Sequence, residues 1–519
     1  MLLGDILRRN AKLYPDKTAI IFKEKGISYA DIENRVMRLS NGLTERGIRR
    51  GDRIGLISHP SSQFIELYIA IPKLGAVLVP LNCRLSGREL EYIINDADVK
   101  MLVMAEEFAD TINSIITNLN TVESLYCIGK PPSGMESYEN LISESSYEVE
   151  DLVVEDDDVA VQMYTSGTTG RPKGAMLTHK NLMSNHIGRV IDLKFNVSDI
   201  FLSCIPYYHV AAEYPLIVLY IGGTLIIQEK FDPAGFLKAV AKEKPTVILL
   251  VPAMVNFVID YIDKHPGIYD FSSVRIFLYG ASPMPVALLK KAIKIFKCDF
   301  FQAYGLTEAS PGVTYLRPED HILEGNEDEV RRLASCGKEV FNVEVRVVND
   351  SGMDVKPDEM GEIIVKGDNI MKGYWKLPDE TALAIRNGWL YTGDMGTVDK
   401  GGFVFIVDRK KDMIISGAEN IYPREVEEVL YANPSILEAA VIGVPDEKWG
   451  ESVKAFVVLK EGESASEKEI IDFCKDNISS YKKPKSVEFL KSLPRNPTGK
   501  VLKKELRKKD WDGYDRDVS

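Results

Sequence analysis

The stretch that decides the fold is residues 164–174, YTSGTTGRPKG. It follows the apolar run Val159–Tyr164, which predicts a buried strand, and it precedes a helical pattern that Thr178 can cap. Its glycines allow tight turns and a close approach of the backbone to a ligand. Its hydroxyl side chains and backbone N–H groups can surround a polyanion, and Lys173 can balance the charge. The stretch therefore predicts a phosphate-binding loop.

This loop differs from the G-x-x-x-x-G-K-[S/T] phosphate loop, because its glycines are closer together and Lys173 is followed by Gly. The alternative is a polar surface loop, in which Gly and hydroxyl residues are common. The length of the string and its Pro-Lys-Gly ending favour the phosphate loop. The residues expected to contact phosphate are Thr165, Ser166, Gly167, Thr168, Thr169 and Lys173.

Length and composition exclude several classes of protein. The chain has 519 residues, of which 45% are apolar and 27% charged, which is typical of globular proteins and too long for one hydrophobic core. The net charge of −13 argues against a general nucleic-acid partner. The six cysteines include no C-x-x-C pair, so we expect no zinc site and no disulfide framework, and a reducing, cytoplasmic location. We also expect no secretory leader and no transmembrane segment.

The patterning predicts an α/β protein. Strand-like and helical runs alternate through most of the chain, which is typical of parallel sheets. The acidic segment 133–158 has no basic residue and is interpreted as a solvated connection between lobes. Residues 334–406 have the shorter alternating runs that are typical of antiparallel strands. After residues 409–412, the pattern predicts a compact α+β unit. The predicted elements are strands 53–58, 76–80, 159–164, 246–251, 274–279, 438–444 and 453–460, and helices 62–74, 182–191, 285–296, 423–432 and 467–478.

The loop resembles the signature loop of the adenylate-forming superfamily, which includes acyl-CoA synthetases, carrier-loading adenylation domains and beetle luciferases. Further motifs of that family recur in the expected order along essentially the whole chain. The resemblance implies a large N-terminal domain of mostly parallel α/β sheets with a small β-barrel-like part, residues 1–408. It also implies a small mobile α+β C-terminal domain, residues 409–519. Lys411 matches the hinge position, where many members have Asp and some have Lys.

A second motif completes the predicted nucleotide site. Residues 304–308, YGLTE, resemble the family's YG-x-TE motif. The resemblance implies that the Tyr304 ring lies against adenine, that Thr307 bonds the α-phosphate and that Glu308 holds Mg²⁺, a cation that prefers oxygen ligands. Standing alone, the string could equally be a helix cap. The other nucleotide-site residues that the resemblance implies are Gly280, Ala281, Ser282, Gln302, Ala303, Gly305, Asp394 at the ribose hydroxyls, and Arg409.

The C-terminal part carries a predicted catalytic lysine and a coenzyme A face. Residues 494–500, PRNPTGK, resemble the loop that brings a mobile Lys500 to the reacting carboxylate and phosphate. Residues 481–509 hold eleven Lys and Arg against two Glu, a net charge of +9 that suits phosphate groups, although such runs are often only solvated. The residues that the resemblance implies at coenzyme A are Ser416, Gly417, Trp449, Tyr481, Lys483 and Lys485.

The acid-binding pocket is less well defined. Residues 206–210, PYYHV, resemble the segment before the family's acyl pocket and place His209 at its mouth. Glu213 is unexpected there: either its carboxylate faces away, or the pocket has a polar feature. The lining residues that the resemblance implies are His209, Val210, Glu213, Val255, Tyr279, Ala309 and Pro311.

Together these motifs imply an AMP-forming acid–thiol ligase that uses ATP, Mg²⁺ and coenzyme A to convert a carboxylic acid into acyl-AMP and then acyl-CoA. The acid is expected to be a medium- or long-chain fatty acid or a cyclic or aromatic carboxylate. The implied catalytic residues are Lys500, Thr307, Glu308 and His209. The alternatives are a free-standing enzyme that loads a carrier protein, a luciferase-like oxygenase and a non-catalytic nucleotide sensor; a homodimer is left open.

Overall fold

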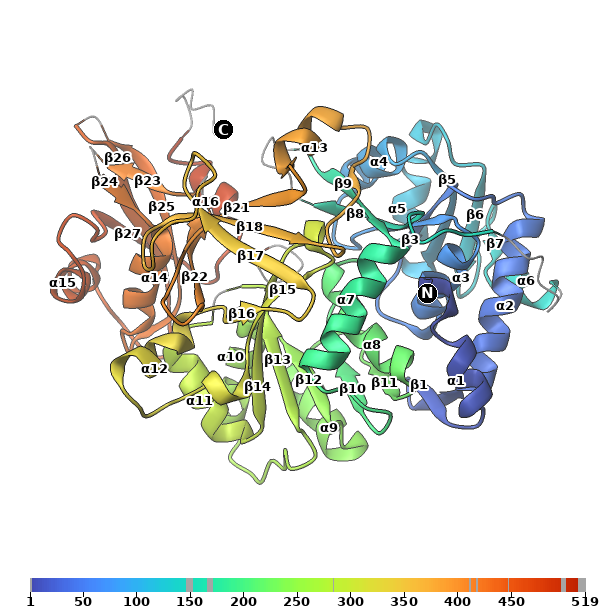
Figure 1. Cartoon of the computed structure of the whole chain (residues 1–519), viewed down its shortest axis with the longest axis horizontal. Coiled ribbons are helices and arrows are strands. Elements are labelled where there is room, and N and C mark those ends of the chain that lie inside the picture. The colour runs from blue at the N-terminus through green and yellow to red at the C-terminus, as the bar shows by residue number, and fades with distance from the viewer. Residues whose placement is uncertain are drawn as a thin grey trace.

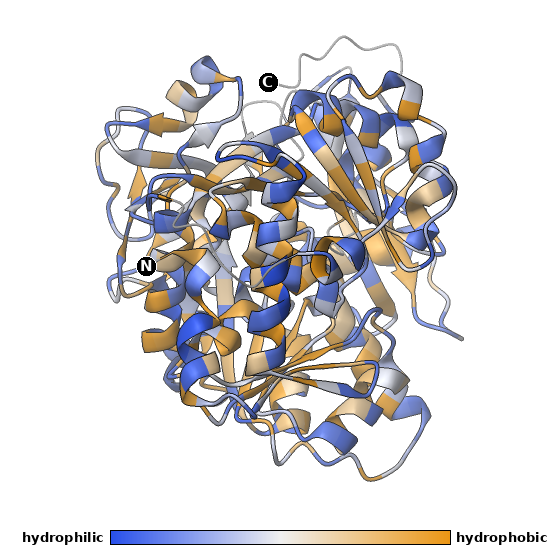
Figure 2. Ribbon diagram, turned by 90° about the vertical axis from the view of Figure 1, so that its right-hand side faces the viewer, coloured by the Kyte–Doolittle hydropathy of each residue, from blue (hydrophilic) through white to orange (hydrophobic). Residues whose placement is uncertain are grey.

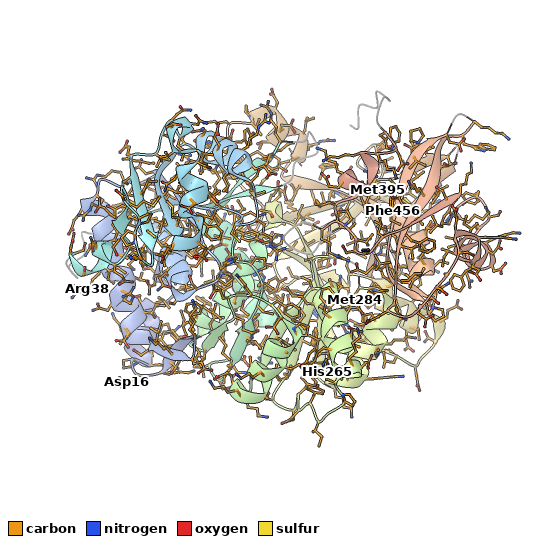
Figure 3. The ribbon with its side chains drawn as sticks, turned by 180° about the vertical axis from the view of Figure 1, so that it is seen from behind. Asp16, Arg38, His265, Met284, Met395 and Phe456 are labelled. Carbon is orange, nitrogen blue, oxygen red and sulfur yellow. The ribbon has the colours of Figure 1, made fainter. Side chains whose placement is uncertain are left out.

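Two large α/β sheets form the body of the protein, and a small domain lies at one end (Figure 1). This computed structural model describes residues 2–145, 153–165, 171–282, 284–409, 412–416, 419–446, 448–495 and 501–511. Seen from behind, Asp16 and Arg38 mark the end of the body away from the small domain, which holds Phe456 (Figure 3).

The first sheet has eight strands. Their order is β19 (Gly373–Tyr374), β9 (Lys173–Thr178), β8 (Val159–Thr165), β4 (Val77–Pro80), β3 (Arg53–Ile57), β5 (Val99–Ala105), β6 (Ser124–Ile128) and β7 (Glu136–Ser137). All pairs from β8 to β7 are parallel, whereas β9 is antiparallel to both of its neighbours. The helices of this half are α2 (Tyr29–Glu45), α3 (Ser62–Lys73), α4 (Gly87–Asp96), α5 (Ala109–Asn113) and α6 (Asn140–Ser143).

The second sheet has nine strands. Their order is β16 (Lys338–Glu339), β15 (Gly312–Leu316), β14 (Asp299–Gly305), β13 (Ile276–Gly280), β12 (Val247–Leu250), β10 (Ile200–Ser203), β11 (Thr224–Ile227), β1 (Thr18–Phe22) and β2 (Lys25–Ser28). The pairs from β14 to β1 are parallel, and the outer strands are antiparallel. The helices are α1 (Arg8–Leu13), α7 (His179–Asp192), α8 (Glu213–Ile221), α9 (Pro233–Glu243), α10 (Pro252–Lys264), α11 (Val286–Phe296) and α12 (Glu327–Arg331).

The main hydrophobic core lies between the two sheets and contains buried residues of α3, α7 and α8. The strands β4 and β12 are buried along their whole length, as expected for parallel strands covered on both faces. Helix α8 has the sequence EYPLIVLYI, apolar almost all round, which explains its central position. In Figure 2 the sheet strands are mostly orange, the hydrophobic colour, while blue gathers along the helices.

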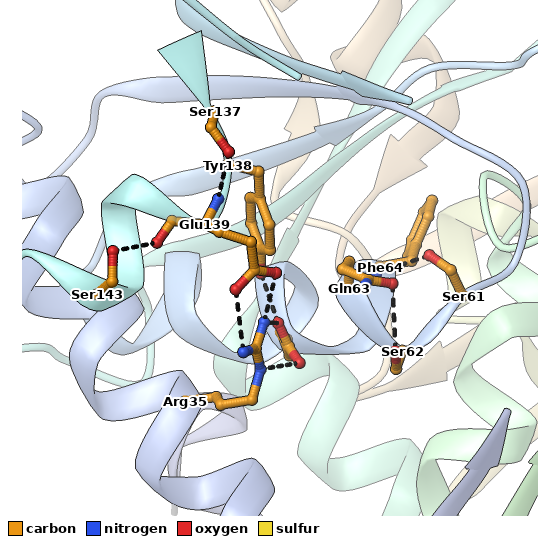
Figure 4. A network of polar contacts seen from close by, with 10 residues as sticks. Arg35, Ser61, Ser62, Gln63, Phe64, Ser137, Tyr138, Glu139 and Ser143 are labelled. Atoms are coloured by element: carbon orange, nitrogen blue, oxygen red, sulfur yellow. Dashed lines mark hydrogen bonds and ion pairs between the residues drawn. The ribbon is translucent and has the colours of Figure 1, made fainter. Parts of the chain in front are cut away.

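The buried carboxylate of Glu66 ties α2 and α3 together, and Figure 4 shows its partners Arg35 and Tyr138. Glu66 on α3 is 1% exposed and accepts from Arg35 Nε at 2.7 Å and from the Tyr138 hydroxyl at 2.6 Å. Arg35 also reaches Glu139 at 2.9 Å. Burial raises the pKa of Glu66, and the Arg35 guanidinium opposes that effect.

A smaller antiparallel sheet joins the body to the small domain. It contains β17 (Val343–Val348), β18 (Gly361–Gly367), β21 (Trp389–Val398) and β20 (Ile385–Arg386), and β22 (Val404–Arg409) also pairs with β21. The helix α13 (Pro378–Ala384) precedes β20. This sheet is the antiparallel part that the sequence predicts for residues 334–406.

The C-terminal domain has its own sheet and core. The strands β24 (Glu419–Ile421), β23 (Ile414–Ser416), β26 (Gly450–Leu459) and β25 (Ile436–Asp446) are antiparallel, and β27 (Ser486–Phe489) is parallel to β26. The helices are α14 (Pro423–Tyr431), α15 (Glu467–Asn477) and α16 (Lys503–Arg507). Buried residues of α14, α15, β25 and β26 form a separate core, which accounts for an α+β unit of this size.

The predicted fold class is confirmed, with two differences in detail. The phosphate loop does not run directly into a helix, because β9 lies between the loop and α7. The acidic segment 133–158 is more than a connection, since it contributes β7 to the edge of the first sheet and also forms α6. The domain boundary at 408/409 stays a prediction. Among the described helices, none combines the length and apolar character needed to cross a membrane.

Candidate active site

The predicted phosphate loop is the turn of the β8–β9 hairpin. Thr165 and Lys173 are cross-strand partners at its base. Thr178 then caps α7, because its hydroxyl accepts from the Asn181 N–H at 3.1 Å. The predicted residues Ser166, Gly167, Thr168 and Thr169 lie outside the described part of the chain.

Lys173 is a buried cation with two contacts from another part of the chain. Its side chain is 9% exposed and forms an ion pair with Glu380 on α13. Its Nζ also lies 5.3 Å from the centre of the Tyr374 ring. Strand β19 brings these residues close, since it pairs with β9 and places Tyr374 opposite Ala175. Sequence reasoning missed Glu380 and Tyr374, because a two-residue strand has no periodic signal.

Glu308 contacts the same Tyr374 through its hydroxyl. The Tyr374 hydroxyl donates to Glu308 Oε1 at 2.8 Å, and Thr307 begins the short helix η5 (Thr307–Ala309) that carries Glu308. No described Lys or Arg forms an ion pair with Glu308, so its carboxylate can accept a metal ion. The described residues include no cluster of three acidic, His or Cys side chains suited to a metal. This donor set fits Mg²⁺, which in nucleotide sites takes few protein carboxylates and completes its shell with phosphate oxygens and water.

Strands β13 and β14 approach closely where the adenine is predicted to lie. Gly280 and Ala303 are partners in this pair, and a Cβ at Gly280 would come within 2.2 Å of the Ala303 carbonyl oxygen. The next residue, Ala281, has a φ of +65°, so the chain turns away sharply after β13. Gln302 is half-buried beside this pair, and Ser282 follows the turn.

Tyr304 and Asp394 join β14 to β21. The Tyr304 hydroxyl donates to Asp394 Oδ2 at 2.7 Å, and both side chains are buried. Asp394 is paired in register with Arg409 on β22. The backbone therefore brings together the predicted adenine and ribose residues; the side chain of Arg409 is not described. Gly305 is also required, because a Cβ there would come within 1.4 Å of the Pro311 carbonyl oxygen.

The predicted acid-site residues fall in two places. His209 caps the short helix η4 (Val210–Ala212), and its Nδ1 accepts from the Ala211 N–H at 3.2 Å, which places the proton of a neutral ring on Nε2. Ala309 is fully buried, and Asn369 Nδ2 donates to its carbonyl oxygen at 2.9 Å. Val255 belongs instead to a second hydrophobic core, the outer core, which contains buried residues of α9, α10 and α11.

Tyr279 is fully buried in that same outer core, and its hydroxyl lies 3.0 Å from His321 Nε2. The other ring nitrogen, His321 Nδ1, is 2.8 Å from the Arg317 carbonyl oxygen and must donate. Nε2 therefore accepts from Tyr279. Burial lowers the pKa of His321 to about 4, so the ring is neutral near pH 7.

Glu213 is turned toward α3 and α7. It is fully buried, its Oε2 lies 2.8 Å from His186 Nε2, and its Oε1 accepts from the Tyr68 hydroxyl. Both oxygens of the carboxylate are thus engaged inside the core.

The predicted coenzyme A residues lie near one edge of the small domain. Ser416 on β23 is paired with Gly450 on β26, next to Trp449, which is 44% exposed. Lys485 Nζ is 5.7 Å from the Trp449 ring and 3.0 Å from Asp446 Oδ2. Tyr481 is exposed and Lys483 half-exposed. The predicted residues Gly417, Lys411 and Lys500 lie outside the described part.

The chain on either side of residues 496–500 is well anchored. Arg495 and Val501 form an antiparallel bridge. Arg495 is 2.6 Å from Glu438 on β25, and Lys503 is 2.8 Å from Glu427 on α14. The described residues on both sides of the predicted catalytic loop are therefore held to the small domain.

Comparison with protein families decides what this arrangement is. The model of the AMP-binding enzymes matches residues 7–375, and the model of the AMP-binding enzyme C-terminal domain matches residues 425–500. The chain belongs to the AMP-binding enzyme family. The predicted resemblance to the adenylate-forming superfamily is confirmed.

The relatives are CoA ligases. A feruloyl-CoA synthase of Amycolatopsis sp is 39% identical over 98% of this chain and 99% of its own length. The solved structure of an anthranilate CoA ligase in complex with anthranoyl-AMP has a TM-score of 0.89 at 28% identity, covering 98% of this chain and 97% of that one. An o-succinylbenzoate CoA synthetase of Bacillus subtilis, solved with ATP and a magnesium ion, has a TM-score of 0.83 at 29% identity, covering 97% and 99%.

These similarities confirm the predicted enzyme class: the protein is an AMP-forming acid–CoA ligase. The prediction of ATP, Mg²⁺ and coenzyme A as its cofactors is confirmed with it. The acid and the roles of individual residues are taken up next.

Proposed function

We propose that this AMP-binding enzyme activates an aromatic carboxylic acid in two steps. In the first, a carboxylate oxygen attacks the α-phosphorus of ATP, the bond to the bridging oxygen breaks and pyrophosphate leaves with the electron pair. In the second, the coenzyme A thiolate attacks the acyl carbon of acyl-AMP, and AMP leaves. The observation that carries this proposal is that Lys173 and Glu308 both contact Tyr374, one at its ring and the other at its hydroxyl.

In the first step, the chain supplies charge and orientation. Lys173 exchanges Glu380 for a phosphate oxygen of ATP, while the Tyr374 hydroxyl holds Glu308 in position. Glu308 would hold Mg²⁺, which when bound would supply positive charge to the phosphate oxygens. Asp394 accepts hydrogen bonds from the ribose, and the tight β13–β14 approach leaves a flat space for adenine. His209 lies at the mouth of the acid site, and Lys500 offsets the charge that builds up during the attack.

In the second step, the C-terminal domain of residues 409–519 turns relative to residues 1–408 about a hinge at Lys411. This withdraws Lys500 and brings the face containing Ser416, Gly417, Trp449 and Lys485 to the acyl-AMP. The exposed Trp449 ring offers a flat contact, and the neighbouring lysines offer partners for phosphate groups. Closure of one domain on another is a known way to order two half-reactions.

The preference for an aromatic acid rests on similarity. A relative named for feruloyl-CoA is 39% identical over nearly the whole chain, and the anthranilate ligase has a closely similar structure. The absence of helices suited to crossing a membrane among the described residues agrees with a small-molecule enzyme. We further propose a cytoplasmic location and leave the oligomeric state to measurement.

The decisive experiment separates the two steps. We expect Lys500→Ala to lower adenylation, measured as acid-dependent pyrophosphate release, by about 10²–10³-fold. Thioester formation from supplied acyl-AMP and coenzyme A should survive in this variant. Equal loss of both half-reactions would contradict the two-state scheme.

The same preparation tests the alternatives. Incubation with ATP, coenzyme A and a panel of aromatic and fatty acids should yield acyl-CoA and AMP from an aromatic acid. A carrier-loading enzyme would form no coenzyme A thioester, and a luciferase-like enzyme would consume oxygen with the adenylate. Turnover of fatty acids alone would contradict the proposed acid class.

A further inference from the structure

Arg189 on α7 is a cation inside the main core. Its side chain is 1% exposed, and its guanidinium lies 4.0 Å from the centre of the Tyr214 ring. Its Nη2 donates to the Ser310 carbonyl oxygen at 3.2 Å. Buried arginines are ordinarily paired with a carboxylate, yet none of the ion pairs found among the described residues includes Arg189.

Two of the hydrogen-bond donors of Arg189 are unused. Within the described ranges, its Nε and Nη1 are buried and have no hydrogen-bond partner, and the same holds for the Ser310 hydroxyl and for Asn185 Oδ1. A guanidinium presents five N–H donors, and leaving such groups buried without acceptors is unfavourable. Arg189 Nε and Nη1 and the Ser310 hydroxyl can therefore still donate to an acceptor oxygen, whereas Asn185 Oδ1 can still accept a hydrogen bond.

The nearby buried carboxylate does not serve this purpose. Glu213 precedes Tyr214 on α8, but its oxygens are taken by His186 and Tyr68. Arg317, another cation next to α7, has its own partner in Asp192 at 2.8 Å. Arg189 is thus set apart from the ion pairs around it.

Arg189 lies between the two segments that form the proposed acid site. Ser310 directly follows the helix η5, which carries Glu308 and Ala309. Tyr214 lies on α8, which begins directly after the short helix capped by His209. A Cβ added at Gly312 would lie 3.3 Å from the Asn185 amide and 3.4 Å from Arg189 Nε, so this glycine also packs beside the guanidinium.

We propose that Arg189 determines substrate specificity by binding an oxygen at the end of the acid opposite its reacting carboxylate. The inference rests on the proposed function and narrows it. The substrate class is an aromatic carboxylic acid with a distal acceptor oxygen, carried by a hydroxyl or a second carboxylate. A fatty acid fits poorly, because its alkyl end offers the unused N–H donors no acceptor.

The wild-type enzyme alone can overturn the proposal. Its kcat/KM for AMP release is compared for 4-hydroxycinnamate, 4-carboxycinnamate, cinnamate and 4-methylcinnamate, and the two oxygenated acids distinguish a hydroxyl from a carboxylate. A site built for a polar group discriminates strongly against analogues that lack it, so we expect at least about a tenfold preference for one oxygenated acid. No preference, or a preference for 4-methylcinnamate, overturns the assignment of Arg189.

Substitution then assigns the preference to one side chain. In Arg189→Leu, the ratio of kcat/KM between the oxygenated acid and cinnamate should fall to about one, with the KM for ATP unchanged. Arg317→Leu is the matched control, since it removes a cation that also contacts α7, and it should keep the wild-type ratio. A merely structural Arg189 would lower kcat/KM for both acids equally, and that result also overturns the proposal.

Two safeguards keep the test independent of folding and of the proposed function. If Arg189→Leu does not fold, Arg189→Lys retains the charge but loses the forked donors and should lower the same ratio. Equilibrium binding of 4-hydroxycinnamate and cinnamate, measured by calorimetry without ATP, should show the same preference and its loss in Arg189→Lys. If no panel acid yields acyl-CoA, the proposed function fails; if cinnamates are turned over without discrimination, only the role of Arg189 fails.

Discussion

Lys173 is the residue whose surroundings most clearly connect structure to chemistry. Its ion pair with Glu380 keeps a buried cation compensated, and Tyr374, whose ring it faces, donates a hydrogen bond to Glu308. The cation is therefore in place before ATP arrives. Such preorganised charge accelerates a reaction because it needs no rearrangement when charge develops.

Substitution of Lys173 and substitution of Glu380 should differ in their effect on kcat/KM for ATP. We expect Lys173→Met to lower kcat/KM for ATP by about 10²-fold, since a charge placed for phosphate is lost. Glu380→Gln breaks the same pair and keeps the cation, so it should lower kcat/KM for ATP clearly less than Lys173→Met does. Acid-dependent AMP release measures both. Equal losses would mean that Lys173 acts only through its ion pair.

Buried histidines should make stability depend on pH. Burial lowers the pKa of both His321 and His179 to about 4, from an ordinary value of 6.5. Between these two values, the unfolded chain binds more protons than the native one. The free energy of unfolding should therefore rise as the pH increases from about 4 to 6.5. The stability that these two histidines contribute is lost as the pH falls through the same window.

His321→Gln should make this dependence shallower, because it removes one of the two groups. Urea unfolding at pH 4.5, 5.5 and 6.5 measures the slope. His265→Gln, which removes an exposed histidine on the surface, is the control and should leave the slope as it is. An unchanged slope in His321→Gln would mean that this ring does not titrate differently in the two states.

Among the elements, α3, α7 and α8 are held together by the carboxylate of Glu213. Tyr68 and His186 both bond to it, and all three side chains are nearly inaccessible. Such a carboxylate specifies how the helices pack, because without it Tyr68 and His186 would both be buried without their hydrogen-bond partner.

We expect Glu213→Leu to lower the free energy of unfolding by about 3–5 kcal/mol, since it leaves Tyr68 and His186 buried without their acceptor. Glu213→Gln retains one acceptor oxygen and the volume, and should cost less. Urea midpoints test both variants. If Glu213 instead formed part of the acid pocket, Glu213→Gln would change the ranking of acids in the panel with little change in the midpoint.

How far these elements follow from sequence depends on their length and burial. The apolar run of β12 is buried over all four residues, and its continuous pattern predicts a parallel strand. Thr178 likewise marks the start of α7 as a cap. Strand β19 could not be predicted, because its two residues owe their conformation to pairing with β9, about two hundred residues earlier. The contact of Glu380 with Lys173 depends on that pairing and was missed for the same reason.

At the scale of the whole molecule, described side chains join the small domain to the body. Arg424 on α14 donates to the Ile406 carbonyl oxygen on β22 and lies 3.5 Å from the Ala334 carbonyl oxygen. Lys264 on α10 is 2.9 Å from Glu461, but these side chains are 50% and 84% exposed. If the small domain turns as proposed, contacts of this kind would stabilise one of its orientations over the other.

The contacts of Arg424 should therefore bias the balance between the two half-reactions. The proposed rotation would break these contacts in the second orientation, so removing them would shift the equilibrium by their differential free energy. Hydrogen bonds from a charged group contribute about 1.5–3 kcal/mol, so Arg424→Leu should change the ratio of adenylation to thioester formation by about tenfold or more.

Lys264→Ala is the matched control, because an exposed ion pair contributes only about 0.2–1 kcal/mol and should change the ratio by less than about fivefold. Both rates are measured separately, with pyrophosphate release for the first step and consumption of supplied acyl-AMP for the second. A fall in adenylation with retained thioester formation would mean that Arg424 stabilises the adenylating orientation, and the opposite change would assign it to the other. If Arg424→Leu left the ratio unchanged, the orientation of the small domain would not depend on this contact, and the proposed rotation would have to be controlled elsewhere.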